Sequence, residues 1–159
     1  LVIVDRLVIY FDSAYNFPEQ HSGVTLLLAT VFFAFQIYCD FSGYSDIALG
    51  TARLFGLELL RNFAFPYFSR DIAEFWRRWH ISLSTWFRDY VYIPMGGNRT
   101  SKSKTILALF IVFVLSGLWH GAGWNFIIWG LLHGLFVIIS ISFAPRKTKE
   151  KNILHSNLN

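Results

Sequence analysis

The sequence predicts an all-α, polytopic membrane protein, with about three transmembrane helices in this chain and an amphipathic helix in the membrane interface. Of the 159 residues, 54% are hydrophobic and only 15% are charged, whereas about a quarter of the residues in a typical soluble domain are charged. The apolar residues come in long uncharged blocks, and residues 105–145 contain no Asp, Glu, Lys or Arg. This composition excludes a disordered chain, a disulfide-stapled mini-protein and an ordinary soluble enzyme.

The first apolar segments differ in how well they suit a bilayer. Residues 1–22 are apolar but are interrupted by Asp5 and Arg6, which predicts an interfacial segment. Residues 24–39 carry no charge. Extended through Phe41, this run is long enough to cross a bilayer core at about 1.5 Å per residue. We therefore expect the first membrane span here.

A break or bend in the helix is predicted directly after this span, at Ser42 and Gly43. Asp40 and Asp46 bracket the break and could form a proton or ion site. Carboxylates in such places also cap broken helices, or pair with an arginine such as Arg53. The structural interpretation is favoured, but the sequence leaves both open.

The clearest periodicity runs from Ile72 to Val91, where apolar and aromatic residues recur at spacings of three and four. This pattern predicts a single amphipathic helix from about Arg70 to Tyr92, with Ser69 as its N-cap. An aromatic face opposite an arginine-bearing face suits a helix that lies along a membrane or tunnel surface. We expect it not to span the bilayer, because arginines are costly against lipid tails.

The uncharged block of residues 105–145 is too long for one span and suits two. The small residues Gly121–Gly123 mark the natural corner between them. We therefore expect one membrane helix over residues 105–120 and another over residues 124–143, folded back as a hairpin.

The net charge of +4 is unevenly placed, and two basic stretches, 98–104 and 146–151, flank this hairpin. The positive-inside rule explains the placement more simply than nucleic-acid binding does, and it predicts that both stretches are cytoplasmic. Because the chain opens mid-pattern at Leu1 without a positively charged leader, we expect residues 1–145 to be part of a larger multi-spanning domain. Residues 146–159 are expected to form a basic polar tail.

Three histidines lie on or beside predicted membrane helices, where an ionisable group is costly and suggests function. His120 lies among small residues in SGLWHGAGW, and a neutral imidazole there can take a proton from a hydroxyl. Spacing alone does not separate this from a histidine packed in a GxxxG contact. His80 borders the aromatic face, with Trp76 and Ser84 four residues away on the same side, and a structural interfacial role is equally open. For His133 we favour helix packing.

The arginines beside His80 are the candidates for binding a charged substrate. Arg77 and Arg78 could hold the phosphates of an acyl carrier, or they could meet lipid headgroups. The sequence contains no recognisable metal motif, Gly-rich phosphate loop or nucleophile motif. We therefore predict no bound metal and no bound cofactor.

Three segments carry a specific resemblance: FQIYCDFSGYSDIALGTARLFG, NFAFPYFSRDIAEFWRRWHISLSTWFRDYVYIPMGGNR and LSGLWHGAGWNFIIWGLLHG. They resemble the membrane-bound O-acyltransferase (MBOAT) family, and most of all its bacterial branch that contains the alginate O-acetyltransferase membrane subunit. The resemblance covers roughly residues 1–143. The ending YIPMGGNR favours this polysaccharide-acetylating branch over the related D-alanyl branch.

The resemblance implies a polytopic acyltransferase with a tunnel, and it implies that His80 and His120 face the tunnel as the catalytic residues. This chain would be the catalytic middle of a longer protein of the inner cell membrane. The donor would be a cytoplasmic acyl thioester, first of all acetyl-CoA, bound with the help of Arg77 and Arg78. The acceptor would be a hydroxyl on the outer side, on an extracellular polysaccharide or on an extracytoplasmic acetyltransferase partner.

Two hypotheses of different classes follow from the sequence. The first is the O-acyltransferase. The second is a non-catalytic transport component in which Asp40, Asp46 and the histidines form an intramembrane ion path. Transporters usually contain paired repeats, and the sequence shows none.

Overall fold

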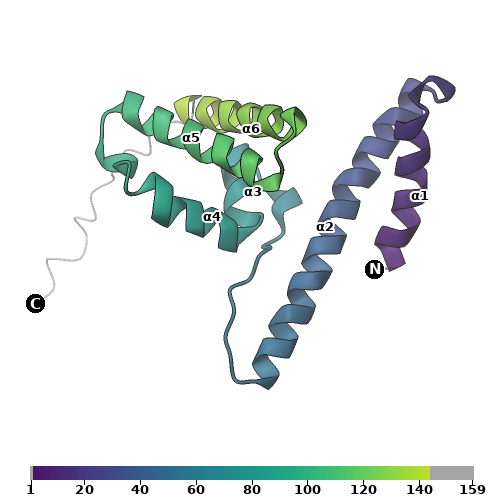
Figure 1. Cartoon of the computed structure of the whole chain (residues 1–159), viewed down its shortest axis with the longest axis horizontal. Coiled ribbons are helices and arrows are strands. Elements are labelled where there is room, and N and C mark those ends of the chain that lie inside the picture. The colour runs from purple at the N-terminus through teal and green to yellow at the C-terminus, as the bar shows by residue number, and fades with distance from the viewer. Residues whose placement is uncertain (1, 144–159) are drawn as a thin grey trace, which may run out of the picture. The chain divides into compact units, whose positions relative to one another are not determined.

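The computed structural model describes residues 2–143, and every regular element in that range is helical (Figure 1). The α-helices are α1 Val2–Asn16, α2 Gly23–Leu54, α3 Ile72–Arg78, α4 Ile81–Phe87, α5 Lys102–His120 and α6 Trp124–Phe143. Three of them, α2, α5 and α6, are long and apolar enough to cross a membrane. These findings confirm the predicted all-α class and the predicted number of spans. The tail of residues 146–159 lies outside the described residues.

The chain forms two compact units, which the sequence did not indicate. The first unit contains the residues up to Pro66 together with Arg78–Ser82, and so includes α1 and α2. The second contains Tyr67–Arg77 and the described residues from Leu83 to Phe143, and so includes α5 and α6. Each unit is described separately below.

In the first unit, α1 and α2 form an antiparallel hairpin (Figure 1). The Ser22 side chain caps α2 by accepting a hydrogen bond from the backbone N–H of Thr25 at 3.3 Å. Phe11 stacks on Phe33 with ring centroids 4.5 Å apart. The predicted interfacial segment of residues 1–22 is therefore largely the helix α1, which packs on the first span.

The predicted break at Ser42 and Gly43 is wrong, because α2 runs unbroken for 32 residues. A single glycine weakens a helix by about 1 kcal/mol but does not interrupt it, and residues 23–54 contain no proline. Within residues 2–143, neither Asp40 nor Asp46 forms an ion pair with Arg53. Since α2 is continuous, the two aspartates do not cap a broken helix.

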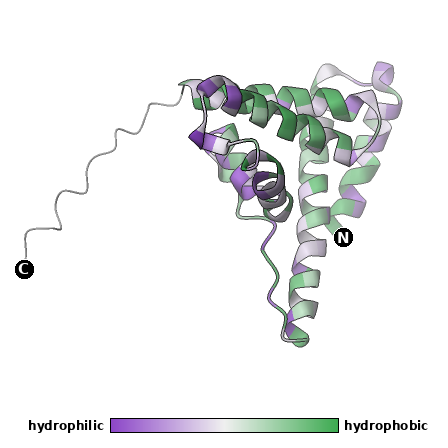
Figure 2. Cartoon of the chain, turned by 60° about the vertical axis from the view of Figure 1, so that its left-hand side comes forward, coloured by the Kyte–Doolittle hydropathy of each residue, from purple (hydrophilic) through white to green (hydrophobic). Residues whose placement is uncertain are grey.

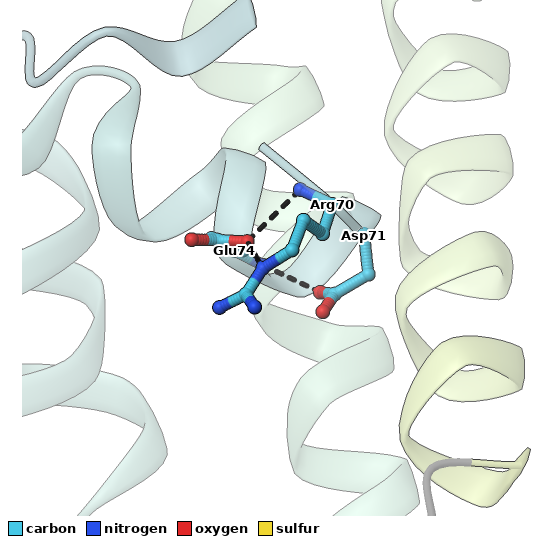
Figure 3. A network of polar contacts seen from close by, with 3 residues as sticks. All are labelled: Arg70, Asp71 and Glu74. Carbon is cyan, nitrogen blue, oxygen red and sulfur yellow. Dashed lines mark hydrogen bonds and ion pairs between the residues drawn. The ribbon is translucent and has the colours of Figure 1, made fainter. Parts of the chain in front are cut away.

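A network of three residues begins α3, and it replaces the predicted N-cap. Asp71 precedes the helix, and its Oδ1 accepts a hydrogen bond from the backbone N–H of Glu74 at 2.7 Å (Figure 3). The Glu74 carboxylate in turn accepts one from the backbone N–H of Arg70 at 2.9 Å. This reciprocal arrangement resembles a capping box. It satisfies the Glu74 N–H, which the first turn leaves unpaired, and the N–H of Arg70 just before the helix. Asp71, and not Ser69, caps this helix.

The single amphipathic helix predicted for residues 70–92 is also wrong. The segment consists of α3, then α4, then the π-helical turn η3 Arg88–Tyr92, with an interruption at Trp79 and His80. The helical period is present on each side of the interruption, but contacts with a distant segment override it. At seven residues each, α3 and α4 are about 10 Å long and too short to cross a bilayer.

In the second unit, α5 and α6 form the predicted hairpin, and both begin and end close to the predicted residues. Hydrophobic residues predominate on both helices (Figure 2). Their backbones approach closely at two glycines. A Cβ atom added at Gly117 would collide with the carbonyl oxygen of Phe126, and one added at Gly130 would collide with that of Phe113. This close contact between small residues is typical of membrane helix pairs.

The turn before α5 contains the segment YIPMGGNR, and its glycines meet a conformational need. Gly96 and Gly97 both have positive φ, at 103° and 53°. The Tyr92 hydroxyl donates a hydrogen bond to Asn98 Oδ1 at 2.6 Å, and the Thr105 hydroxyl donates one to the Gly97 carbonyl at 3.0 Å. Burial raises the pKa of Tyr92, so its phenol remains a neutral donor at physiological pH.

The hairpin makes the predicted topology testable. Because α5 and α6 are antiparallel, cysteines placed at Ser103 and Thr148 should be labelled from the same face of the membrane, which the basic flanks predict to be the cytoplasmic one. A cysteine at Ala122, in the corner, should not be labelled from that face. The measurement is labelling with a membrane-impermeant maleimide in a Cys39→Ser background. Labelling of Ser103 and Thr148 from opposite faces would contradict the hairpin. Residue 148 and the flank 146–151 lie outside the described residues.

Candidate functional site

His80 lies at the interruption between α3 and α4 and has an unusual backbone conformation. Its φ is +45°, and among residues 2–143 the only other non-glycine residue with positive φ is Phe65. A left-handed conformation costs a non-glycine residue roughly 1–3 kcal/mol and persists only where surrounding contacts enforce it. Such strain is frequent at functional sites.

The contacts that enforce this conformation come from the connector after α2. The Ala64 N–H donates a hydrogen bond to the Arg78 carbonyl at 3.0 Å, and the Ile81 N–H donates one to the Asn62 carbonyl, also at 3.0 Å. The connector therefore pairs with the backbone on both sides of His80. This pairing explains why the helical pattern is interrupted at that residue.

The Asn62 side chain adds further hydrogen bonds between the connector and the residues around His80. Its Oδ1 accepts hydrogen bonds from the Ser82 hydroxyl at 2.6 Å and from the Ser82 backbone N–H at 3.2 Å. Its Nδ2 donates to the hydroxyl of Ser45, a buried residue of α2, at 3.2 Å. Asn62 thus links α2 to the first turn of α4.

Aromatic rings pack around this link. The Phe63 ring makes edge contacts with Tyr38, Phe41 and Trp79 at centroid distances of 5.4, 5.2 and 5.0 Å. The His80 ring lies edge-on to Phe41 at 4.6 Å. The imidazole of His80 is therefore held against α2 by an aromatic cluster of the first unit.

The helical spacing that placed Trp76, His80 and Ser84 on one side does not survive the interruption. Trp76 belongs to the second unit, where its ring contacts Trp129 and His133 at 5.6 and 5.1 Å. Ser84 donates a hydrogen bond to the Trp76 carbonyl at 3.3 Å. Trp76 and Ser84 are therefore in contact through this hydrogen bond, and His80 takes no part in it.

Arg77 and Arg78 are consecutive residues in the last turn of α3. The Arg77 side chain is exposed, and Arg78 is half-buried. Consecutive residues of a helix do not share a face. Their role in donor binding stays a prediction.

His120 is the last residue of α5, and its side chain is exposed in the second unit. Its ring lies edge-on to Trp119 and Trp129 at 5.0 and 5.2 Å. Gly121 follows directly, and a Cβ atom added there would lie 2.6 Å from the Phe126 ring. The corner is therefore narrow on one side of His120, whereas the imidazole itself stays accessible.

His133 lies between two tryptophan rings of the second unit, Trp76 and Trp129. The Trp129 ring contacts both His120 and His133, the latter at 4.7 Å. The Nδ1 atom of His133 and the Nε1 atom of Trp76 are buried and have no hydrogen-bond partner within residues 2–143. The structure thus brings His120 and His133 to one tryptophan, and it assigns His80 to the other unit.

Sequence reasoning missed Asn62, which forms hydrogen bonds with the two residues that follow His80. Asn62 lies in a connector without periodicity, and its partners are Ser45, 17 residues before it, and Ser82, 20 residues after it. No local pattern encodes such contacts. Among the described residues, no group of three or more His, Cys, Asp or Glu side chains could hold a metal ion.

Comparison with known proteins gives a family match. The model of MBOAT, the membrane-bound O-acyltransferase family, matches residues 2–150. The match includes both histidine segments, and it bears out the resemblance of the three sequence segments. It also supports the first of the two hypotheses drawn from the sequence over the transport component.

Individual relatives agree with this match. The chain is 47% identical over 148 residues to the probable alginate O-acetylase AlgI of Pseudomonas aeruginosa, covering 91% of this chain and 28% of that protein. It is 42% identical over 149 residues to the peptidoglycan O-acetyltransferase of Helicobacter pylori, covering 92% and 28%. It is 36% identical over 132 residues to the teichoic acid D-alanyltransferase of Bacillus subtilis, covering 79% and 33%. The chain therefore spans about a third or less of the length of these relatives.

Proposed function

The chain belongs to the membrane-bound O-acyltransferase family, and from this premise we propose that the full-length protein transfers an acetyl group from a thioester to a hydroxyl of a cell-surface polysaccharide. The family match carries the proposal, because it covers both candidate histidines. The two acetylating relatives, at 47% and 42% identity, are more similar to the chain than the D-alanylating one at 36%. Acetyl is therefore the preferred acyl group.

His120 is the residue to which we assign general-base catalysis. An unactivated alcohol attacks a thioester slowly, so a base must stand within hydrogen-bond reach of the acceptor hydroxyl. The imidazole of His120 is exposed at the end of a predicted span, beside the Gly121–Gly123 corner. This position gives two substrates room to meet.

The transfer balances with these groups alone. His120 takes the proton of the acceptor hydroxyl while the hydroxyl oxygen bonds to the thioester carbonyl carbon. The carbon–sulfur bond then breaks, and the leaving thiolate takes up the proton that His120 holds. The products are an ester and a free thiol. His80 would orient a substrate or stabilise negative charge on the thioester oxygen.

The proposal also includes the acyl donor, the partner protein and the membrane in which the protein lies. We assign acetyl-CoA as the donor substrate, with Arg77 and Arg78 binding its phosphates by charge. The protein would lie in the inner cell membrane, with an extracytoplasmic acetyltransferase completing transfer to the polymer. No resident cofactor is required by this chemistry.

Proteoliposomes of the full-length protein test the proposal. Acetyl-labelled coenzyme A is supplied with alginate or peptidoglycan fragments, and both free thiol and label in the polymer are measured. Protein-dependent thiol release is expected. A D-alanyl carrier thioester is the contrasting donor, and preference for it would overturn the acetyl assignment. If a well-inserted protein consumed neither thioester, the proposed function would be refuted.

A further inference from the structure

The first turn of α4 is capped by a residue from outside its own sequence. The first N–H groups of a helix have no partner within the helix, and the residue before the helix usually supplies one through a Ser, Thr, Asp or Asn side chain. Before α4 that residue is His80, a poor cap. Asn62 takes over this task, because its carbonyl accepts from the Ile81 N–H and its Oδ1 accepts from the Ser82 N–H. The residue at position 80 therefore does not need a capping side chain, and a histidine can occupy this position.

Asn62 also opposes the local preference of residues 70–92 for a continuous helix. The apolar spacing through residues 70–92 favours one continuous helix, whereas the structure has His80 at a φ of +45°. The strained backbone conformation of His80 therefore needs stabilising contacts from outside residues 70–92. Asn62 provides them, and its bond to buried Ser45 fixes it to α2.

We propose that Asn62 is a positioning residue that holds His80 at the helix interruption, with its imidazole against Phe41. Without the Asn62 side chain, the interruption relaxes toward a regular helix, and the His80 ring moves away from its place on α2. This inference rests on the proposed function, in which His80 takes part. It assigns to Asn62 no contact with substrate.

Two variants and a matched control test the proposal in the full-length protein. Asn62→Ala removes all the side-chain bonds. Asn62→Asp keeps an acceptor for Ser82, and the Ser45 hydroxyl can donate to its second oxygen. Asn98→Ala is the control, because it removes the same atoms and one hydrogen bond, from Tyr92, far along the sequence. Amounts of inserted protein are equalised before any comparison.

The kinetic readout separates positioning from general damage. A misplaced catalytic group costs about 10²-fold in rate, so kcat with acetyl-CoA should fall about 10- to 100-fold in Asn62→Ala while KM stays within about threefold. Asn62→Asp should restore most of kcat, and Asn98→Ala should leave it within about threefold of wild type. Wild-type kcat in Asn62→Ala would overturn the proposal, as would a loss that Asn62→Asp does not restore.

Hydrogen–deuterium exchange of the backbone gives a readout that needs no substrate. In Asn62→Ala the peptide containing Ile81 and Ser82 should exchange faster, because the Ser82 N–H loses its acceptor, and Asn62→Asp should restore the protection. Unchanged exchange in Asn62→Ala would overturn the hold on the backbone. A wild-type protein that consumed no thioester would instead refute the proposed function, and the exchange data would still decide whether Asn62 holds the backbone at His80.

Discussion

Replacing His120 with alanine should abolish most acyl transfer by the full-length protein and leave its expression and membrane insertion intact. General-base catalysis is typically worth about 10²–10⁴ in rate, and the alanine side chain offers no base. The ring of His120 is exposed and makes only edge and stacking contacts with Trp119, Phe126 and Trp129. Its removal should therefore cost little stability. The measurement is the initial rate of thiol release per inserted protein.

Two other histidines provide the controls for this experiment. His21→Ala, in the turn between α1 and α2, should leave the rate unchanged. His133→Ala should lower the rate much less than His120→Ala, because the Nδ1 atom of His133 is buried among aromatic rings, whereas His120 is exposed. Wild-type turnover by well-inserted His120→Ala would return His120 to a packing role. A larger loss in His133→Ala would transfer the catalytic assignment to His133.

The second large effect concerns stability, and it should appear at Gly130. An alanine Cβ there collides with the backbone carbonyl of Phe113, and a backbone atom cannot move aside as a flexible side chain can. The α5–α6 hairpin must then open, and overpacking of this kind costs about 1–3 kcal/mol. A lower midpoint of thermal unfolding of the detergent-solubilised full-length protein measures the effect.

The same substitution at Gly43 should act in the opposite direction. Apart from its chain neighbours and the nearby backbone of α2, no described residue would lie within 4 Å of a Cβ atom at Gly43, and alanine is favoured over glycine within a helix by about 1 kcal/mol. Gly43→Ala should therefore leave the midpoint unchanged or raise it. Equal midpoints for Gly130→Ala and wild type would show that the close approach of α5 and α6 is not required for stability.

Hydrophobic pattern alone was sufficient to predict the hairpin of α5 and α6. The hairpin over residues 105–120 and 124–143 could be predicted because an uncharged block of fixed length and a glycine corner leave little choice. The interruption at His80 could not be predicted. It depends on hydrogen bonds that Asn62 accepts from Ser82, 20 positions away, and these compete successfully with a strong local period.

The candidate site shows the same division. His80 and His120 stand out in the sequence because imidazoles near membrane helices are rare and costly. The residues that surround these histidines do not stand out in the sequence, because Phe41 and Trp129 are ordinary aromatic residues in apolar runs. The continuity of α2 was missed for a related reason. Ser42 and Gly43 suggest a break, but a lone glycine without proline is tolerated within a helix.

The continuity of α2 fixes where along this helix His80 makes its contact. The uncharged residues 23–39 measure about 26 Å and nearly fill a hydrocarbon core of about 30 Å. The same rigid rod continues from Asp40 to Leu54 for about 22 Å more. Phe41, which the His80 ring contacts, lies in the first turn of this continuation. The contact with Phe41 therefore places the imidazole of His80 beside the end of the uncharged stretch of α2, where the charged residues begin, and not beside its middle.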